Sequence, residues 1–222
     1  MLETQGMFHC RRFRARCLSR LPCSPALPAP SLSTAFAENP AAALVAKPGA
    51  LPDMALGSPK APVTIVEYSS MTCPHCAAFS ENVFPMLQSK YIDTGRVRFV
   101  SRQFPLDMLA VGAAMLAHCI ANGDSPKFFD ATSMIFKRQH ELTQRPLDTL
   151  ESVGDHFGMS GESVKACEQD AGLFEKIKAD HDLAFEQLKV DATPTFFVNG
   201  EKLRGSMSFE ELDKKLTTLL ER

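Results

Sequence analysis

Two cysteines separated by two residues form the part of the sequence best suited to chemistry, and the motif reads Cys73-Pro74-His75-Cys76. Such a pair can close a small disulfide or bind a metal ion. Residues 63–68 are rich in β-branched and aromatic side chains, which predicts a buried strand that ends shortly before the motif. Proline is well tolerated in the first turn of a helix, so a helix is predicted to begin at the motif.

The predicted junction of strand and helix favours the thiolate form of Cys73. The first cysteine of the motif would face unpaired backbone N–H groups and the positive end of the helix dipole. His75 would lower the pKa of Cys73 further if its ring is protonated or donates a hydrogen bond. A stabilised thiolate means a stable reduced form, and hence a disulfide that readily oxidises other dithiols. Cys76, one turn further along the helix, is expected to be shielded and to act as the resolving thiol.

Two other uses of the motif remain open at this point: a zinc site and an inert structural disulfide. Zinc usually takes four ligands, and no second Cys-x-x-Cys or His-x3–5-His pair follows the motif. A disulfide that closes so short a loop removes little entropy from the unfolded chain and stabilises a fold weakly. The position of the motif therefore favours redox chemistry.

The rest of the chain predicts the elements that position this motif. Pro85 lies inside the helix that follows the motif and should kink it. Asn199-Gly200 favours the two-residue turn of a β-hairpin, and Ser208 begins a capping box at the last helix. Strands are predicted at residues 63–68, 96–100, 195–198 and 202–204. Helices are predicted at residues 73–90, 107–122, 126–138, 147–157, 161–169, 173–188 and 208–220.

Length and composition describe a globular protein of one large or two small domains. The chain has 222 residues, of which 45% are hydrophobic and 23% charged, and these values exclude wholesale disorder. No run of about eighteen apolar residues occurs, so no transmembrane helix is predicted. The formal net charge of −2 argues against a protein that binds nucleic acid through a basic surface.

Residues 1–37 differ in composition from the rest of the chain. They carry five arginines and one glutamate, and they end in Ala35-Phe36-Ala37, which fits the A-x-A rule for signal-peptidase cleavage. Four prolines interrupt the apolar segment that a signal peptide needs, so an organelle-targeting leader, a disordered tail and a misassigned start codon remain alternatives. We predict an atypical leader over residues 1–37, followed by an extended lead-in over residues 38–60.

Over residues 57–222 the sequence resembles the DsbA family of thiol oxidases, and in particular its α-proteobacterial members. The resemblance rests on Cys73-Pro74-His75-Cys76, on Val66-Glu67-Tyr68 and on Ala192-Thr193-Pro194-Thr195. It implies an α/β protein with a thioredoxin fold and an inserted all-helical domain. Residues 61–105 and 189–222 would form the thioredoxin-fold domain, and residues 106–188 the helical insertion. In this family, Pro-His between the cysteines is a signal for the oxidising branch.

The resemblance also assigns a substrate-binding role to Thr193 and Pro194. It implies a cis peptide bond between them that faces the disulfide. The backbone of Thr193 would then offer main-chain hydrogen bonds to an extended substrate peptide. Composition alone favours the alternative, an ordinary trans proline at the start of an edge strand.

Glu67 is a further candidate for the site, because it lies six residues before Cys73 within an apolar run. A buried carboxyl group near the pair could relay the proton of Cys76 during exchange, with its own pKa raised by desolvation. The alternative is a partly exposed or salt-bridged glutamate. This alternative is favoured from sequence, because unpaired burial of glutamate is rare.

Cys119 and Cys167 are the two other cysteines that cleavage after Ala37 would leave in the chain, and both lie on apolar faces of predicted helices. They could be buried free thiols that act as small hydrophobic side chains. An oxidising compartment and an even cysteine count favour a bridge, and some DsbA-like proteins carry such a pair in the helical domain. We therefore predict a structural disulfide between them.

Together these features predict a protein dithiol–disulfide oxidoreductase that donates the Cys73–Cys76 disulfide to reduced, unfolded exported proteins. The atypical leader predicts export to the periplasm. The resemblance implies reoxidation by a DsbB-like, quinone-linked membrane protein. We expect a monomer that needs no metal or organic cofactor and binds no nucleic acid.

Three alternatives use the same motif. A disulfide isomerase or reductase could be built on the same fold, although residues 38–60 are too short for the N-terminal dimerisation domain of isomerase relatives. A glutathione-dependent isomerase of the related fold need not keep both cysteines. A non-enzymatic module could bind copper or zinc through Cys73, His75 and Cys76.

Overall fold

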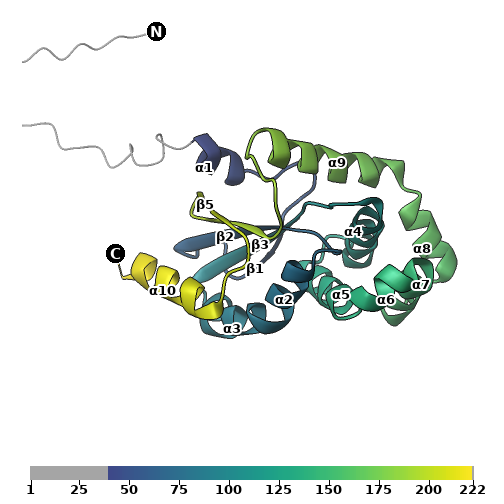
Figure 1. Ribbon diagram of the computed structural model, residues 1–222, viewed down its shortest axis with the longest axis horizontal. Coiled ribbons are helices and arrows are strands. Elements are labelled where there is room, and N and C mark those ends of the chain that lie inside the picture. The colour runs from purple at the N-terminus through teal and green to yellow at the C-terminus, as the bar shows by residue number, and fades with distance from the viewer. Residues whose placement is uncertain (1–39, 222) are drawn as a thin grey trace, which may run out of the picture. The chain divides into compact units, whose positions relative to one another are not determined.

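The computed structural model describes residues 40–221, which contain a five-stranded β-sheet (Figure 1). The sheet has the strand order β1-β3-β2-β4-β5, in which β2 and β3 are parallel and the other neighbours are antiparallel. The strands are β1 (Met54–Leu56), β2 (Val63–Ser69), β3 (Val97–Gln103), β4 (Thr195–Val198) and β5 (Glu201–Arg204). The leader and the cleavage site predicted within residues 1–37 lie outside the described residues.

Helices cover both faces of the sheet. In Figure 1, α2, α3 and α10 lie on one face, and α1 and α9 lie on the other. The first group is α2 (Pro74–Asn82), α3 (Phe84–Leu87), which runs into a π-helical turn (Gln88–Ile92), and α10 (Phe209–Leu220). The remaining helices are α1 (Pro40–Val45), α4 (Met108–Ala121), α5 (Ser125–Lys137), α6 (Gln139–Gln144), α7 (Pro146–His156), α8 (Gly161–Glu168) and α9 (Ala171–Glu186).

Successive side chains of β2 point to opposite faces of the sheet and pack against different helices. Ile65 points to one face, where it packs with Phe99 against α2, α3 and α10. Val66 and Tyr68 point to the other face and pack with Phe197 against α1 and α9. Because β2 pairs with β3 on one side and β4 on the other, it is a central strand buried on both faces. The cysteine motif therefore follows the carboxyl end of the most protected strand.

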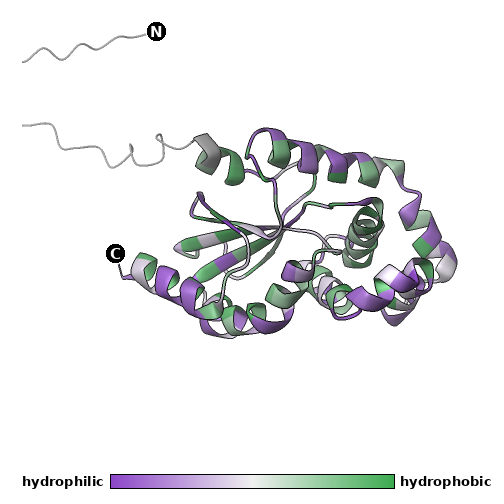
Figure 2. Ribbon diagram, viewed as in Figure 1, coloured by the Kyte–Doolittle hydropathy of each residue, from purple (hydrophilic) through white to green (hydrophobic). Residues whose placement is uncertain are grey.

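Helix α4 is the centre of the helical segment between β3 and β4. Its residues Ala113, Ala114 and Ala117 are fully buried, and α5, α7 and α8 pack around it. Figure 2 shows α4 as hydrophobic over most of its length, whereas α5 to α8 carry polar residues as well. A helix that is apolar all round needs to be surrounded by other elements, and the neighbouring helices provide this cover.

Three local signals in the sequence are confirmed by the structure. Asn199 and Gly200 have φ values of 47° and 84° and form the turn between β4 and β5. Ser208 and Glu211 form a reciprocal capping box at the start of α10. The helix after the cysteine motif breaks between α2 and α3, just before Pro85. In each case the signal acts within a few residues, which is why sequence alone was sufficient.

The prediction of an extended lead-in over residues 38–60 is wrong, because this stretch contains helix α1 and the edge strand β1. Its alanine-rich start favours a helix, and β1 pairs with the outer side of β3. Arg102 of β3 holds α1 and β1 in place. Its guanidinium binds Asp53, just before β1, at 2.8 Å and donates to the carbonyl oxygen of Val45, the last residue of α1, at 3.0 Å. The positions of α1 and β1 thus depend on the side chain of Arg102, which lies far along the sequence.

Candidate active site

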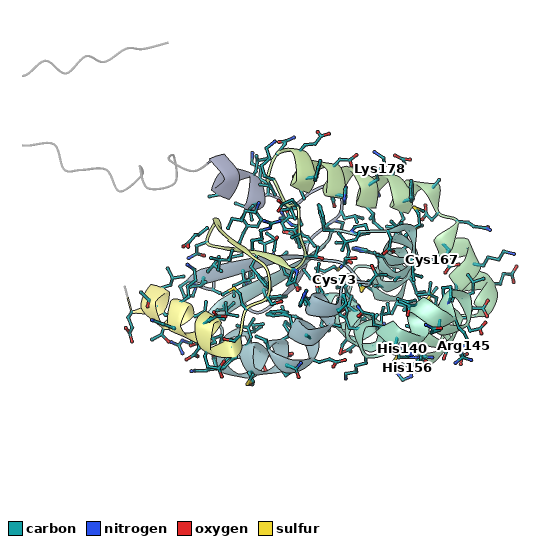
Figure 3. The ribbon with its side chains drawn as sticks, viewed as in Figure 1. Cys73, His140, Arg145, His156, Cys167 and Lys178 are labelled. Atoms are coloured by element: carbon teal, nitrogen blue, oxygen red, sulfur yellow. A yellow bond between two sulfur atoms is a disulfide. The ribbon has the colours of Figure 1, made fainter. Side chains whose placement is uncertain are left out.

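Cys73 occupies the N-cap position of α2. Its backbone is extended, with φ −82° and ψ 119°, and Pro74 follows as the first residue of the helix. The carbonyl oxygen of Cys73 accepts hydrogen bonds from the backbone N–H groups of Cys76 at 3.1 Å and Ala77 at 3.2 Å. Figure 3 shows the Cys73 side chain at the start of α2. The sulfur therefore lies at the positive end of a helix of nine residues.

The loop before β4 lies against Cys73. The peptide bond between Thr193 and Pro194 is cis, and the Cys73 thiol donates a hydrogen bond to the carbonyl oxygen of Thr193 at 3.3 Å. The hydroxyl of Thr193 is buried and has no hydrogen-bond partner among the described residues. Once Cys73 loses its proton, this hydroxyl can donate to the sulfur. The fold thus brings together candidate residues 120 positions apart in the sequence.

These surroundings lower the pKa of Cys73 from 9.0 to about 5. The largest cause is the hydrogen bond from the Cys76 thiol. Burial opposes it by disfavouring the charged form, whereas Thr193 and the backbone N–H groups of Cys76 and His75 lower the pKa further. Cys73 is therefore poised to act as a thiolate at neutral pH.

Cys76 has the opposite environment. It is completely buried, and this burial raises its pKa far above the ordinary value. Its hydrogen bond to Cys73 and the negative charge of Glu67 act in the same direction. The two cysteines of the motif are thus clearly different, one a stabilised thiolate and the other a shielded thiol.

Glu67 lies on β2 and is only 7% exposed. It forms no ion pair with any residue in the range 40–221, so the partly exposed or salt-bridged glutamate favoured from sequence is wrong. Burial, and secondarily the thiolate of Cys73, raise its pKa to about 8. The reason is its place on the central strand, where helices cover the sheet on both faces.

A cavity of about 230 Å³ adjoins Glu67 between α2, α3 and α5. Its polar lining includes Ser80, Asp130 and Ser133, and phenylalanine side chains form much of the rest. A cavity of this volume with polar groups in a largely aromatic wall has room for several water molecules. It gives the buried carboxyl group polar surroundings on one side.

His75 and Pro74 both have exposed side chains. The contribution of His75 to the low pKa of Cys73 comes from its backbone N–H group. The imidazole interaction suggested by the sequence is therefore not the source of this shift. Pro74 contributes by its position, as the residue that starts the helix behind Cys73.

Asp107 and Gln139, which the sequence did not mark as site residues, also contact the turn before α2. The hydroxyl of Thr72 donates to the carboxylate of Asp107 at 2.7 Å. The side-chain amide of Gln139 donates to the carbonyl oxygens of Met71 and Cys73. Asp107 and Gln139 both lie in the segment between β3 and β4. No local sequence pattern marks either of their contacts with the turn.

Cys119 and Cys167 are joined by a disulfide that links α4 to α8. Figure 3 labels Cys167 on α8, away from the start of α2 in this view. The two half-cystines pack with Met115 and Ile177, in a different hydrophobic cluster from Cys73 and Cys76. The bridge therefore lies outside the candidate active site.

Between residues 40 and 221, no three His, Cys, Asp or Glu side chains are grouped closely enough to hold a metal ion. In the same range, no helix has the length and apolar character needed to cross a membrane.

Comparisons with known proteins identify the family of the chain. The family model described as Thioredoxin matches residues 50–218. A protein of Rickettsia typhi named for protein-disulfide oxidoreductase activity is 34% identical over 171 residues, which are 76% of this chain and 62% of that relative. The chain thus spans less than two thirds of the length of this relative. Disulfide bond formation protein D of Bacillus subtilis is 27% identical over 167 residues, 72% of this chain and 74% of that protein.

Solved structures confirm the predicted fold class. The crystal structure of Wolbachia pipientis alpha-DsbA1 superposes with a TM-score of 0.72 at 32% identity, covering 77% of this chain and 92% of that chain. Oxidised BdbD from Bacillus subtilis gives a TM-score of 0.68 at 24% identity, covering 77% and 94%. The described residues therefore form an α/β thioredoxin fold with a helical insertion between β3 and β4.

Proposed function

The chain belongs to the thioredoxin family, in its DsbA-like branch, and we propose that it is a thiol:disulfide oxidoreductase that passes the Cys73–Cys76 disulfide to reduced, unfolded exported proteins. One observation carries this proposal: Cys73 is a stabilised thiolate against the backbone of Thr193, whereas Cys76 is a buried thiol. Such asymmetry stabilises the dithiol form and makes the disulfide a strong oxidant.

The first step is attack by a substrate thiolate on the sulfur of Cys73 in the disulfide form. A bond forms between the substrate sulfur and Cys73, and the bond between Cys73 and Cys76 breaks. The electron pair leaves with Cys76, which takes up a proton because burial disfavours its thiolate. We assign the orientation of the substrate to the backbone of Thr193, at the cis bond to Pro194, which lies beside the reacting sulfur.

The second step releases the product. A second substrate thiolate attacks the substrate sulfur of the mixed disulfide, and Cys73 leaves as a thiolate. Because the pKa of Cys73 is about 5, this thiolate is a good leaving group. The substrate has then lost two electrons as a disulfide, and Cys73 and Cys76 have gained them as a dithiol.

Glu67 is our candidate for the proton donor to Cys76. Its pKa of about 8 keeps the carboxyl group protonated at neutral pH, so that it has a proton to give in the first step. We assign proton exchange with solvent to the adjoining cavity, whose wall includes the polar side chains of Ser80, Asp130 and Ser133. Pro74 and His75 act through the backbone, at the start of the helix behind Cys73.

The proposed location of the protein and its reoxidising partner both rest on disulfide chemistry. The Cys119–Cys167 disulfide supports export to the periplasm after removal of residues 1–37, because disulfides persist in oxidising compartments. Each turnover leaves a dithiol whose two electrons need an acceptor, and we assign this role to a DsbB-like, quinone-linked membrane protein. We assign residues 61–105 and 189–222, together with β1, to the thioredoxin-fold domain and residues 106–188 to the insertion, and we expect a monomer as the functional unit.

The proposal is tested by mixing the oxidised full chain with a reduced, unfolded protein, and by following the loss of substrate thiols. We expect one disulfide to be transferred per molecule, and no transfer by a Cys73→Ser variant. A parallel assay with a scrambled, fully oxidised substrate measures isomerase activity. Tight stoichiometric binding of copper or zinc without thiol exchange would instead favour the metal-binding module.

A further inference from the structure

Gln139 is the first residue of α6 and reaches from the helical insertion to the turn before α2. Its Nε2 atom donates to the carbonyl oxygen of Met71 at 2.9 Å and to that of Cys73 at 3.1 Å. Carbonyl oxygens only accept hydrogen bonds, so the amide nitrogen, and not the amide oxygen, has to face them. Both hydrogens of the amide nitrogen are therefore used on the active-site turn.

The two carbonyl groups that Gln139 holds lie on either side of Thr72. One belongs to Met71, which is buried, and the other to Cys73 itself. The carbonyl oxygen of Cys73 also accepts the first two hydrogen bonds of α2, so Gln139 adds a third donor at the start of the helix. The dipole of the Gln139 amide places partial positive charge beside the carbonyl group of Cys73.

We propose that Gln139 is a positioning residue for thiol–disulfide exchange: by holding the carbonyl groups of Met71 and Cys73, it keeps the Cys73 sulfur at the start of α2. The inference rests on the proposed function and adds to it a contribution from the helical insertion. Without the two hydrogen bonds, the turn loses its link to α6, and its remaining contacts hold the Cys73 sulfur less firmly. The sulfur then spends less time at the helix start and beside Thr193.

The fold does not depend on this contact alone. Cys73 still donates its backbone N–H to the carbonyl oxygen of Ser70, and Thr72 still donates to Asp107. The side chains of Met71 and Cys73 remain in the hydrophobic cluster that includes α4 and α5. Removal of Gln139 should therefore affect the reactivity of Cys73 more than the stability of the protein.

Two substitutions separate positioning from simple packing. Gln139→Leu keeps the approximate volume and removes both donors, and Gln139→Glu keeps the shape but turns carboxylate oxygens toward two carbonyl oxygens. Gln144 is a matched control, because it is an exposed glutamine at the other end of α6. Gln144→Leu and Gln144→Glu make the same chemical changes without touching the turn.

The experiment measures alkylation of the reduced full chain by iodoacetamide at a series of pH values, with mass spectrometry of the peptide that contains Cys73. We expect Gln139→Leu to reduce the alkylation rate below pH 5 by about threefold to tenfold, the factor that one to two weak hydrogen bonds supply. Gln139→Glu should reduce the rate further at pH values above 5, where its carboxylate adds a like charge near the thiolate. The Gln144 variants should behave as the wild type.

Wild-type pH profiles for both Gln139 variants would overturn the inference, and so would failure of both variants to fold, since the residue would then be structural. Thermal unfolding followed by circular dichroism tells these two cases apart. The proposed function fails separately, when the wild-type chain transfers no disulfide to a reduced protein. In that case the alkylation profiles still measure whether Gln139 positions Cys73.

Discussion

The buried carboxyl group of Glu67 should make the free energy of unfolding depend on pH. Its pKa rises from 4.5 to about 8 on folding, chiefly because burial disfavours the charged form. The folded protein therefore holds a proton at Glu67 that the unfolded chain releases. It follows that the stability associated with Glu67 is fully present below pH 4.5 and is lost as the pH rises through 8.

The magnitude follows from the size of the pKa change. At about 1.4 kcal/mol for each pKa unit, the rise from 4.5 to about 8 corresponds to about 5 kcal/mol of lost stability across this pH range. Glu67→Gln keeps the shape of the side chain and removes the ionisation. The free energy of unfolding of the variant, relative to that of the wild type, should therefore increase by about 5 kcal/mol between pH 4.5 and pH 8.

The assay is guanidinium unfolding of both reduced proteins at several pH values. Circular dichroism is the suitable signal, because the chain contains no tryptophan. Both proteins keep Cys73, whose lowered pKa adds stability as the pH rises above 5, so the difference between them reports Glu67 together with its coupling to the Cys73 thiolate.

Glu81→Gln is the matched control, since Glu81 is exposed on α2. Its unfolding free energy should run parallel to that of the wild type. Parallel curves for Glu67→Gln as well would mean that Glu67 ionises in the folded protein as easily as in the unfolded chain, contrary to its raised pKa. The proton-donor role assigned to it would be lost with this result.

Three further predictions test other parts of the account. Replacing both Cys119 and Cys167 with alanine should lower the unfolding free energy by about 4 kcal/mol, because the bridge closes a loop of 48 residues, and should leave disulfide transfer intact. Arg102→Leu should lower it by about 3 to 5 kcal/mol in the same denaturation assay, because it leaves a largely buried carboxylate without its cation. Cys76→Ala should form a stable mixed disulfide with an oxidised substrate, because the Cys73 thiolate attacks a substrate disulfide, one substrate sulfur leaves as a thiolate, and no Cys76 thiol is present to release the other; the product is visible on a non-reducing gel, and an equal yield from a Cys73→Ala chain would contradict the assigned roles.

Local patterns predicted the parts of the fold that depend on near neighbours in the sequence. The strand at residues 195–198 matches β4, and the strand at 63–68 matches β2 to within one residue. In both, β-branched and aromatic side chains fill a buried strand, and the Asn199-Gly200 turn fixes the hairpin that follows. The cysteine motif could be placed for the same reason, since Pro74 and the preceding strand specify where the helix starts.

Long-range contacts account for what the sequence did not reveal. Arg102 holds Asp53 from 49 positions away, and Gln139 meets the carbonyl of Cys73 from 66 positions away. Neither partner belongs to a recognisable pattern. The burial of Glu67 is of the same kind, because it depends on helices that reach the sheet from distant parts of the chain. Statistics for an average glutamate therefore gave the wrong expectation.

The decisive quantity is the reduction potential of the Cys73–Cys76 couple, measured by equilibration with glutathione, together with a titration of the Cys73 thiolate absorbance against pH. We expect an oxidising couple, above about −180 mV, and a Cys73 pKa of about 5. A potential near the value of about −270 mV that is typical of thioredoxin, with a thiol that titrates at its ordinary pKa, would contradict this expectation.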